Sequence, residues 1–403
     1  MNIKNNIEIL RLDDEGRGIG YIDNKIIFIP NAIPSEIVNV DILVETSKYY
    51  VGKVVDYVKL SDDRIEPKCP YYNNCGGCSL QHMSYSDSLN YKSSKFKNIL
   101  NKFASINKDI EVIENNDYFG YRNKIDLKII DNEWGYYNSY THDFISVDKC
   151  LLVSNSINKV IEYKCLFDIK NGNIIIRSNY NDEILIVINS KEKVSIDIDT
   201  LKTKVKLVGI ILNDKVYYGE KYFIEKFGNY LFKVNYNSFF QVNNFITEKM
   251  IDIIKKYSYG KNLLDLYCGV GFLGQCVSKC YNKIYGIEIN QDSIIDAINN
   301  ANINAIDNTY YLCGDSAKCI DKINENIDTL LIDPPRTGLV KNMVNDVIKV
   351  NAERIIYVSC NPISLARDLY NLKEFYNIEK IYLLDMFSNT YHFESVTILN
   401  KKS

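Results

Sequence analysis

The fold is decided by the stretch Leu263-Leu264-Asp265-Leu266-Tyr267-Cys268-Gly269-Val270-Gly271-Phe272-Leu273-Gly274. Its apolar start predicts a buried strand, and the three glycines follow at the spacing G-x-G-x-x-G. Glycines at a strand-to-helix turn let the backbone approach a bound ligand closely. The stretch therefore predicts the first strand and the ligand loop of a doubly wound α/β domain.

The residues that follow alternate between apolar runs and helical segments such as 293–304, which favours a mainly parallel, Rossmann-like sheet over residues 226–403. The expected strands are Lys283-Ile284-Tyr285-Gly286-Ile287, Thr329-Leu330-Leu331-Ile332 and Arg354-Ile355-Ile356-Tyr357-Val358. We interpret this part of the chain as the catalytic domain.

The preceding residues are rich in short β-like runs separated by turn signals. Residues 1–60 predict a small OB-like barrel, in which Gly16, Arg17, Gly18 and Gly20 resemble the start of the RNA-binding TRAM module. A purely structural barrel is the alternative. Residues 61–225 predict a central domain. It begins with a cysteine-bearing stretch at about residues 62–85, called the cysteine segment, and continues with β-rich, mostly antiparallel runs.

Three reactive groups lie at expected strand ends of the catalytic domain: Cys360 after Tyr357-Val358-Ser359, the turn Asp333-Pro334-Pro335-Arg336, and Glu394. Carbon 5 of uracil is a poor nucleophile until a thiolate adds to carbon 6, and a base must later remove the carbon-5 proton. Cys360 as nucleophile and Glu394 as base fit this chemistry. The alternative is that Cys360 is a buried small apolar residue.

The glycine loop alone could bind a dinucleotide. Glu288, about twenty residues further on, suits the ribose diol that NAD and S-adenosylmethionine share. The form Asp-Leu-Tyr-Cys-Gly and the later Asp333-Pro334-Pro335 favour S-adenosylmethionine as the cofactor. Asp315 stands where an adenine-contacting acid usually stands, and a helix N-cap is its alternative role. Arg336 after Asp-Pro-Pro disfavours an amino-group methylase, which would place an aromatic residue there.

Cys69, Cys75 and Cys78 place three thiols within ten residues, and Cys150 is the candidate for a fourth. Four thiolates hold either structural zinc or a [4Fe-4S] cluster. Zinc sites usually combine two close cysteine pairs, so three clustered cysteines and one distant cysteine fit the iron–sulfur cluster better.

The composition indicates the cell compartment and the kinds of partner that the chain could have. The chain has 403 residues, eleven cysteines and a net charge of -3. The charge argues weakly against a nucleic-acid partner without excluding one. The absence of a signal-peptide pattern or a long apolar stretch predicts a cytoplasmic protein without a membrane partner, where thiols serve chemistry or metals.

In its motifs and their order, nearly all of the chain resembles the 5-methyluridine RNA methyltransferases, specifically the bacterial branch that acts on 23S rRNA and carries a [4Fe-4S] cluster. The motifs include Tyr121-Arg122-Asn123-Lys124 and Ser238-Phe239-Phe240-Gln241-Val242-Asn243. Phe272 departs from members that have a polar, cofactor-contacting residue there. The resemblance implies that Gln241, Tyr267, Glu288 and Asp333 contact S-adenosylmethionine, that Cys360 and Glu394 are catalytic, and that Cys69, Cys75, Cys78 and Cys150 hold the cluster.

Two alternatives stay open: a tRNA 5-methyluridine methyltransferase, and a non-catalytic RNA-binding assembly factor on the same fold. We expect RNA as the partner, no DNA, and a monomer. Candidates for the RNA-facing surface are Arg17, Arg122 and Lys124.

Overall fold

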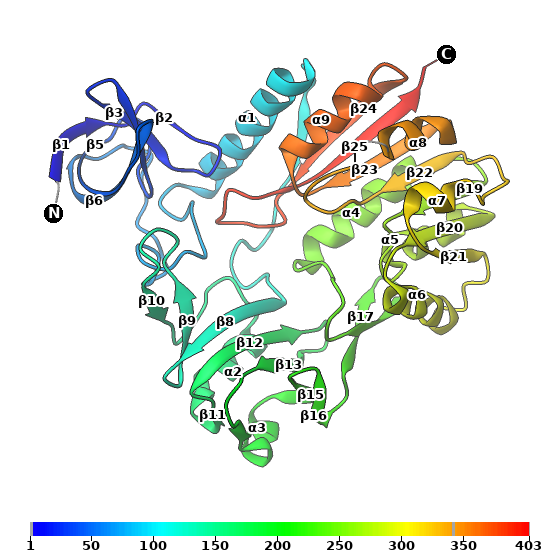
Figure 1. Cartoon of the computed structure of the whole chain (residues 1–403), viewed down its shortest axis with the longest axis horizontal. Helices are drawn as coiled ribbons and strands as arrows, with labels where there is room; N and C mark the ends of the chain where they lie inside the picture. Colours follow the sequence, from blue (N-terminus) through cyan, green and yellow to red (C-terminus); the bar gives the residue numbers. More distant parts are fainter. Residues whose placement is uncertain (1–2, 341–342, 403) are drawn as a thin grey trace.

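The computed structural model describes residues 3–340 and 343–402. The chain folds into three lobes (Figure 1): the N-terminal β-lobe in blue, a central sheet in green, and a larger α/β lobe that includes the C-terminus. Within the described ranges, no helix has the length and apolar character needed to span a bilayer.

The first lobe is a curled six-stranded sheet with the order β1-β5-β6-β4-β3-β2. Two glycines in β3 allow its close packing, since a Cβ on Gly18 would lie 2.8 Å from Ile9 Cγ2 and one on Gly20 would lie 2.6 Å from Ile7 Cγ2. Both isoleucines are buried in the core of this lobe. The strands are β1 (Ile3–Glu8), β2 (Arg11–Leu12), β3 (Gly18–Ile22), β4 (Lys25–Ile29), β5 (Ile37–Glu45) and β6 (Tyr49–Lys59).

The central lobe contains a seven-stranded sheet with the order β10-β9-β8-β12-β13-β15-β16. All neighbouring strands run antiparallel except β13 and β15, which are parallel. Val160 and Ile161 of α2 and Leu201 of α3 close its core. The elements are β8 (Lys124–Ile130), β9 (Glu133–Tyr137), β10 (Phe144–Ser146), α2 (Asn155–Glu162), η1 (Lys164–Leu166), β11 (Phe167–Asp168), β12 (Asn171–Ser178), β13 (Glu183–Asn189), β14 (Ser195–Ile196), α3 (Ile198–Lys204), β15 (Lys206–Leu212) and β16 (Lys215–Gly219).

The α/β lobe is built on an eight-stranded sheet with the order β21-β20-β19-β22-β23-β25-β24-β7. From β19 the chain adds strands first on one side and then on the other, so the topological switch point lies between β19 and β22. The elements are β17 (Tyr222–Phe227), β18 (Tyr230–Asn235), α4 (Asn244–Tyr257), β19 (Asn262–Leu266), α5 (Phe272–Cys276), η2 (Ser278–Cys280), β20 (Lys283–Glu288), α6 (Gln291–Ile303), β21 (Thr309–Cys313), α7 (Ser316–Ile320), β22 (Thr329–Ile332), α8 (Met343–Val350), β23 (Arg354–Ser359), α9 (Pro362–Leu372), β24 (Tyr376–Leu384) and β25 (Glu394–Lys401).

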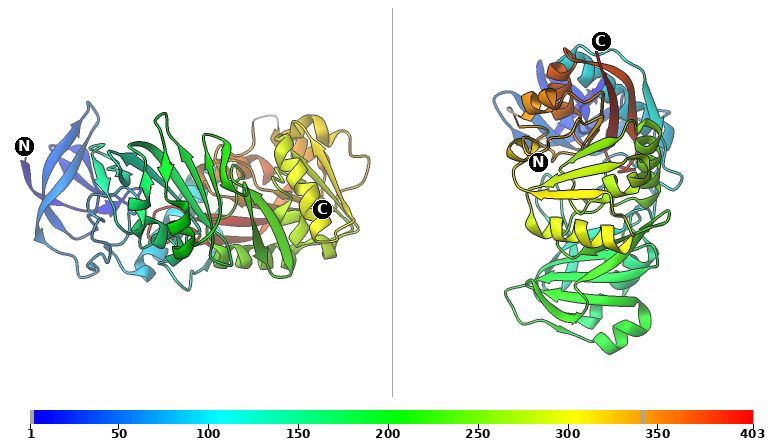
Figure 2. Two further views of the ribbon diagram at one scale, coloured as in Figure 1. Left: turned by 90° about the horizontal axis from the view of Figure 1, so that it is seen from below. Right: turned by 90° about the vertical axis from the view of Figure 1, so that its right-hand side faces the viewer.

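Helices cover both faces of this sheet, as two turned views show (Figure 2). Successive residues of β23 point to opposite faces. Ile355 and Tyr357 belong to one core, with residues of α9, and Ile356 and Val358 belong to the other, with residues of α4. The double burial explains why the strands are continuous apolar runs rather than alternating ones.

The α/β lobe also takes two elements from residues that the sequence assigned to the central domain, 61–225. β7 (Ile110–Ile113) is the parallel neighbour of β24, and α1 (Tyr85–Ala104) packs beside α9. Phe96 of α1 is fully buried in the core of the lobe. The expected domain boundaries stay predictions, and the chain visits the α/β lobe before it forms the central sheet.

Candidate active site

The thiol and the carboxylate are brought together by strand register. β23 and β25 pair antiparallel, with Ser359 opposite Ser395. Continuing this register by one position places Cys360 opposite Glu394. Directly opposed residues of an antiparallel pair have Cβ atoms about 4.5–5.5 Å apart. The two expected catalytic residues, which lie far apart in the sequence, are therefore neighbours at one edge of the sheet.

A short turn fixes the backbone around Cys360. Asn361 caps α9, because its Oδ1 accepts from the Ile363 N–H at 3.0 Å. Its Nδ2 donates to the Arg336 carbonyl at 2.9 Å, and the Ser364 hydroxyl donates to the same carbonyl at 3.1 Å. The turn after β22 is thus tied to the turn that carries the thiol, while the Arg336 side chain stays exposed.

The charges around Cys360 oppose one another. Burial raises the pKa of the half-buried thiol to about 11, and the carboxylates of Glu394 and Asp333 also raise it. The Arg336 guanidinium lowers the pKa of Cys360. Since the thiolate is the nucleophilic form, the Arg336 guanidinium favours the reactivity of Cys360. The sequence indicated no such role for Arg336.

Burial raises the pKa of Glu394 well above its usual range, and nearby Asp333 raises it further. The side chain of Glu394 is only 4% exposed. Burial raises the pKa of Asp333 as well, and Arg336 acts in the opposite direction on Glu394. A carboxylate with a raised pKa is a stronger base, as proton removal from carbon requires.

The glycine loop has the geometry expected of a ligand-binding turn. Tyr267 adopts a φ of 63°, in the left-handed region that non-glycine residues seldom adopt. Gly271 has a φ of 76°, and a Cβ there would lie 2.5 Å from the Tyr311 hydroxyl. Asp265 is buried, and its Oδ2 accepts from the Gly274 N–H at 3.1 Å. Asp265 therefore holds the loop in shape, a role that the sequence did not indicate.

Glu288 ends β20 beside this loop. One of its carboxylate oxygens accepts from the Gly269 N–H at 3.2 Å and the other from the Asn290 N–H at 2.9 Å. Asp315 caps α7 through a 3.1 Å bond from the Ala317 N–H, which confirms its N-cap alternative. Its charge also raises the pKa of Tyr267, so it lies near the same loop.

Gln241 lies in the segment that joins the central and α/β lobes. It is 7% exposed, and its carbonyl accepts from Asn123 Nδ2 at 3.0 Å. The preceding Phe240 packs against Phe272 of α5, with ring centroids 4.9 Å apart. This contact places the segment beside the glycine loop. It also explains the departure at Phe272, which is a buried core residue.

The four expected ligand cysteines come together. Cys69, Cys75, Cys78 and Cys150 line one cavity of about 190 Å³ and are all free thiols. Burial and the neighbouring thiols raise the pKa of Cys75 to about 11. In the part of the chain that the structure describes, no three or more His, Cys, Asp or Glu side chains are arranged as a metal site.

The donor set nevertheless fits a metal group bound through sulfur. Gln81 Nε2 donates to Cys78 Sγ at 3.2 Å, and the Gly77 N–H donates to Cys75 Sγ at 3.4 Å. Such N–H···S bonds are the outer interactions that stabilise thiolate ligands.

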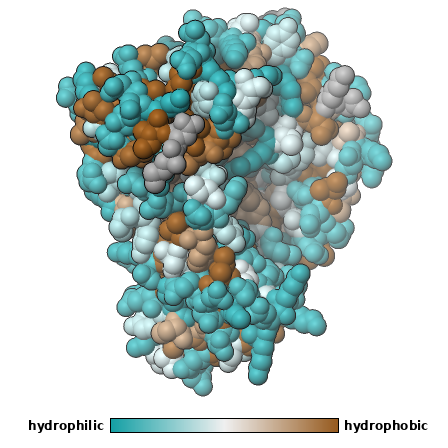
Figure 3. Space-filling model, turned by 60° about the vertical axis from the view of Figure 1, so that its left-hand side comes forward, coloured by the Kyte–Doolittle hydropathy of each residue, from teal (hydrophilic) through white to brown (hydrophobic). Residues whose placement is uncertain are grey.

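A large cleft of about 920 Å³ runs from the first lobe to the active-site edge. Arg17 and Lys53 of the first lobe line it, and so do Arg336, Tyr391 and His392 of the α/β lobe. Burial and nearby cations lower the pKa of His392 to about 4, so this imidazole is neutral at pH 7. Figure 3 shows polar and apolar side chains mixed over the barrel side of the molecule.

The three expected RNA-facing cations differ in setting. Arg17 is paired with Asp13 at 2.6 Å, which offsets its charge. Arg122 lines both the cleft and the cysteine cavity. Lys124 lines the cysteine cavity but not the cleft. Burial and the nearby Arg177 lower the pKa of Lys124. Arg122 is therefore the candidate that the geometry favours.

Comparison with known proteins gives two family matches. A family model described as tRNA (uracil-5-)-methyltransferase matches residues 181–402, and one described as TRAM domain matches residues 5–55. An uncharacterized RNA methyltransferase of Clostridium tetani is 33% identical over 98% of this chain and 95% of its own length. An uncharacterized RNA methyltransferase of Clostridium acetobutylicum is 31% identical over 99% of this chain and 98% of its own length.

Among solved structures, the tRNA (uracil-54, C5)-methyltransferase of Pyrococcus abyssi, in complex with S-adenosyl-L-homocysteine, has a similar fold. The TM-score is 0.79 with 24% identity, over 97% of this chain and 99% of that one. The expected fold class, an α/β domain with an N-terminal β-barrel, is confirmed.

Arg336→Gln should slow alkylation of Cys360 by iodoacetamide at pH 8, because loss of the cation raises the pKa of the thiol. The thiolate fraction falls about tenfold for each unit that the pKa rises above the pH. Mass spectrometry of the Cys360 peptide measures the rate, with exposed Arg11→Gln as control. An unchanged Cys360 rate would show that Arg336 does not act on the thiol.

Proposed function

Because this chain belongs to the tRNA (uracil-5-)-methyltransferase family and is an S-adenosylmethionine-dependent RNA methyltransferase, we propose that it methylates carbon 5 of a specific uridine in 23S rRNA. The observation that carries the proposal is the β23–β25 register, in which Ser359 lies opposite Ser395, so that its continuation sets Cys360 opposite Glu394. A non-catalytic assembly factor would have no use for this arrangement.

The choice of rRNA rests on the first lobe and the cysteine segment. The TRAM match covers residues 5–55, and both parts line the cleft that leads to the active-site edge. The similar Pyrococcus enzyme acts, by its name, on a transfer RNA. Transfer RNA is therefore the alternative substrate of this chain.

In the proposed reaction, the Cys360 thiolate adds to carbon 6 of the extruded uracil and turns carbon 5 into an enolate carbon. Bound S-adenosylmethionine supplies an electrophilic methyl group. Glu394 then removes the carbon-5 proton, the carbon–sulfur bond breaks, and Cys360 leaves as a thiolate. The proton passes from Glu394 to water. Arg336 favours the thiolate at the start and at the end.

The cofactor would be held by Gln241, Tyr267, Glu288 and Asp333. The strained turn at Tyr267 and the tie between Glu288 and the glycine loop support this assignment. Both features lie at the carboxyl ends of β19 and β20, beside the switch point where open α/β sheets bind ligands.

We assign a [4Fe-4S] cluster to Cys69, Cys75, Cys78 and Cys150, with zinc as the alternative. The shared cavity and the N–H···S bonds support a group held by thiolates. The methyl transfer moves no net electrons, so the role of the cluster is structural: it would join the cysteine segment to the central sheet.

Glu394→Gln should accumulate a covalent RNA adduct on ordinary substrate, because attack and methylation proceed while proton removal stalls. The wild-type protein should form a lasting adduct with RNA that carries 5-fluorouridine, since fluorine cannot leave as a proton does. Denaturing gels detect both adducts. Cys360→Ala is the control and should form neither adduct. Normal turnover by Glu394→Gln would mean that another group is the base.

Protein purified without oxygen should be brown and contain about four irons per chain. Cys150→Ala should lose most of this iron, whereas exposed Cys165→Ala should keep it. Elemental analysis and the visible absorption spectrum measure both. Stoichiometric zinc without iron would show that the site is a zinc site.

Deletion of the gene should remove 5-methyluridine from 23S rRNA and leave transfer RNA unchanged. Mass spectrometry of nuclease digests from the two purified RNAs measures the modification. Complementation with the Cys360→Ala protein is the control and should not restore it. Loss of 5-methyluridine from transfer RNA alone would establish the alternative substrate.

A further inference from the structure

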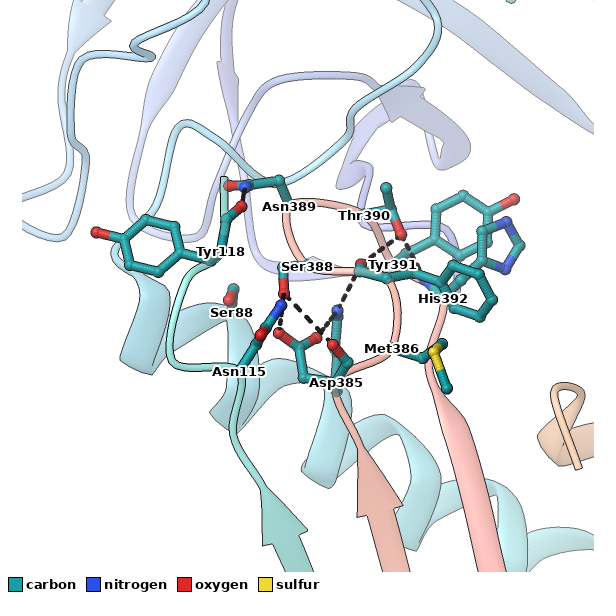
Figure 4. A network of polar contacts seen from close by, with 12 residues as sticks. Ser88, Asn115, Tyr118, Asp385, Met386, Ser388, Asn389, Thr390, Tyr391 and His392 are labelled. Carbon is teal, nitrogen blue, oxygen red and sulfur yellow. Dashed lines mark hydrogen bonds and ion pairs between the residues drawn. The ribbon is translucent and has the colours of Figure 1, made fainter. Parts of the chain in front are cut away.

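The loop that leads to Glu394 is held by several buried polar contacts. Residues 385–393, called the C-terminal loop from here on, connect β24 to β25, and the pair Leu384 and Glu394 closes it. Its residues Phe387, Thr390, Tyr391 and His392 line the cleft. Figure 4 shows this loop and its network of contacts from close by.

A fully buried ion pair anchors the root of the loop. Lys92 of α1 donates to Asp385 Oδ1 at 2.5 Å and to the Phe387 carbonyl at 3.1 Å. Both charged side chains are 0% exposed. The Tyr85 hydroxyl donates to the second oxygen of Asp385 at 2.9 Å. Charges buried in this way are costly unless they are paired, so the pair defines one position of the loop.

The cysteine segment holds the far side of the same loop. The N–H groups of Ser79 and Leu80 both donate to the Asn389 carbonyl, at 3.0 and 3.1 Å. The Ser79 hydroxyl accepts from the Tyr391 N–H at 3.0 Å. Ser79 directly follows Cys78, and Tyr391 lies three residues before Glu394.

We propose that Ser79 is a positioning residue that holds the C-terminal loop, already anchored by the Lys92–Asp385 ion pair, so that Glu394 stays opposite Cys360 during proton removal. The inference rests on the proposed covalent mechanism and adds to it: the cysteine segment acts on the catalytic base as well as on the RNA-facing surface. The thiol is held independently, by the turn at Asn361. Loss of the loop contacts should therefore impair the base step more than the attack step.

Ser79→Ala tests this without breaking the buried ion pair. It should lower kcat about tenfold, the effect of one lost hydrogen bond of typical strength, and it should raise the fraction of enzyme trapped as adduct on ordinary RNA. Adduct formation with 5-fluorouridine RNA and the affinity for S-adenosylmethionine should match the wild type. Ser79→Thr, which keeps the hydroxyl, should restore turnover.

Ser86→Ala is the matched control, because the Ser86 hydroxyl forms its hydrogen bond with the nearby Ser84 hydroxyl and, among the described residues, none with the C-terminal loop. Asn389→Gly is a second test: it keeps the left-handed backbone of Asn389, whose φ is 64°, and removes its bond to the Tyr118 carbonyl. Wild-type kcat in both Ser79→Ala and Asn389→Gly, or equal slowing of the attack and base steps, would overturn the positioning role. Failure of the wild type to form any adduct with 5-fluorouridine RNA would instead overturn the covalent mechanism.

Discussion

The active site depends on one antiparallel strand in an otherwise parallel sheet. β25 runs against both β23 and β24, so its first residue lies at the same edge as the last residues of β22 and β23. If β25 were parallel to β23, its first residue would lie at the other end of the strands, one strand length away from Cys360. The antiparallel direction of β25 brings Glu394 beside Cys360 and Asp333. There, the charge of each carboxylate raises the pKa of neighbouring groups.

This grouping sets the electrostatic character of the site. Asp265, Asp333 and Glu394 are acids whose pKa values burial raises, and each additional carboxylate makes ionisation of the next harder. Such a cluster suits a base that must accept a proton from carbon and opposes formation of a thiolate. Arg336 offsets that second effect from the exposed side, where a negatively charged RNA backbone would meet it.

Local patterns in the sequence were sufficient to predict the glycine loop and the strand ends at which the candidate site residues lie, because each depends on neighbours in the chain. The sequence could not give the register that opposes Cys360 to Glu394, since register follows from pairing between distant segments. The same holds for the placement of β7 and α1, which depends on contacts with β24 and α9, far along the chain. The supporting role of Asp265 also depends on a tertiary contact, to the Gly274 N–H.

The part of the chain that enters the α/β lobe before the central sheet forms also holds the C-terminal loop in place. α1 supplies Lys92 to the root of the loop, and the cysteine segment, which precedes α1, supplies Ser79 to its far side. This stretch of chain therefore connects the cysteine cavity to the loop that leads to Glu394, so a disturbance at the cysteine cavity reaches Glu394 through few bonds.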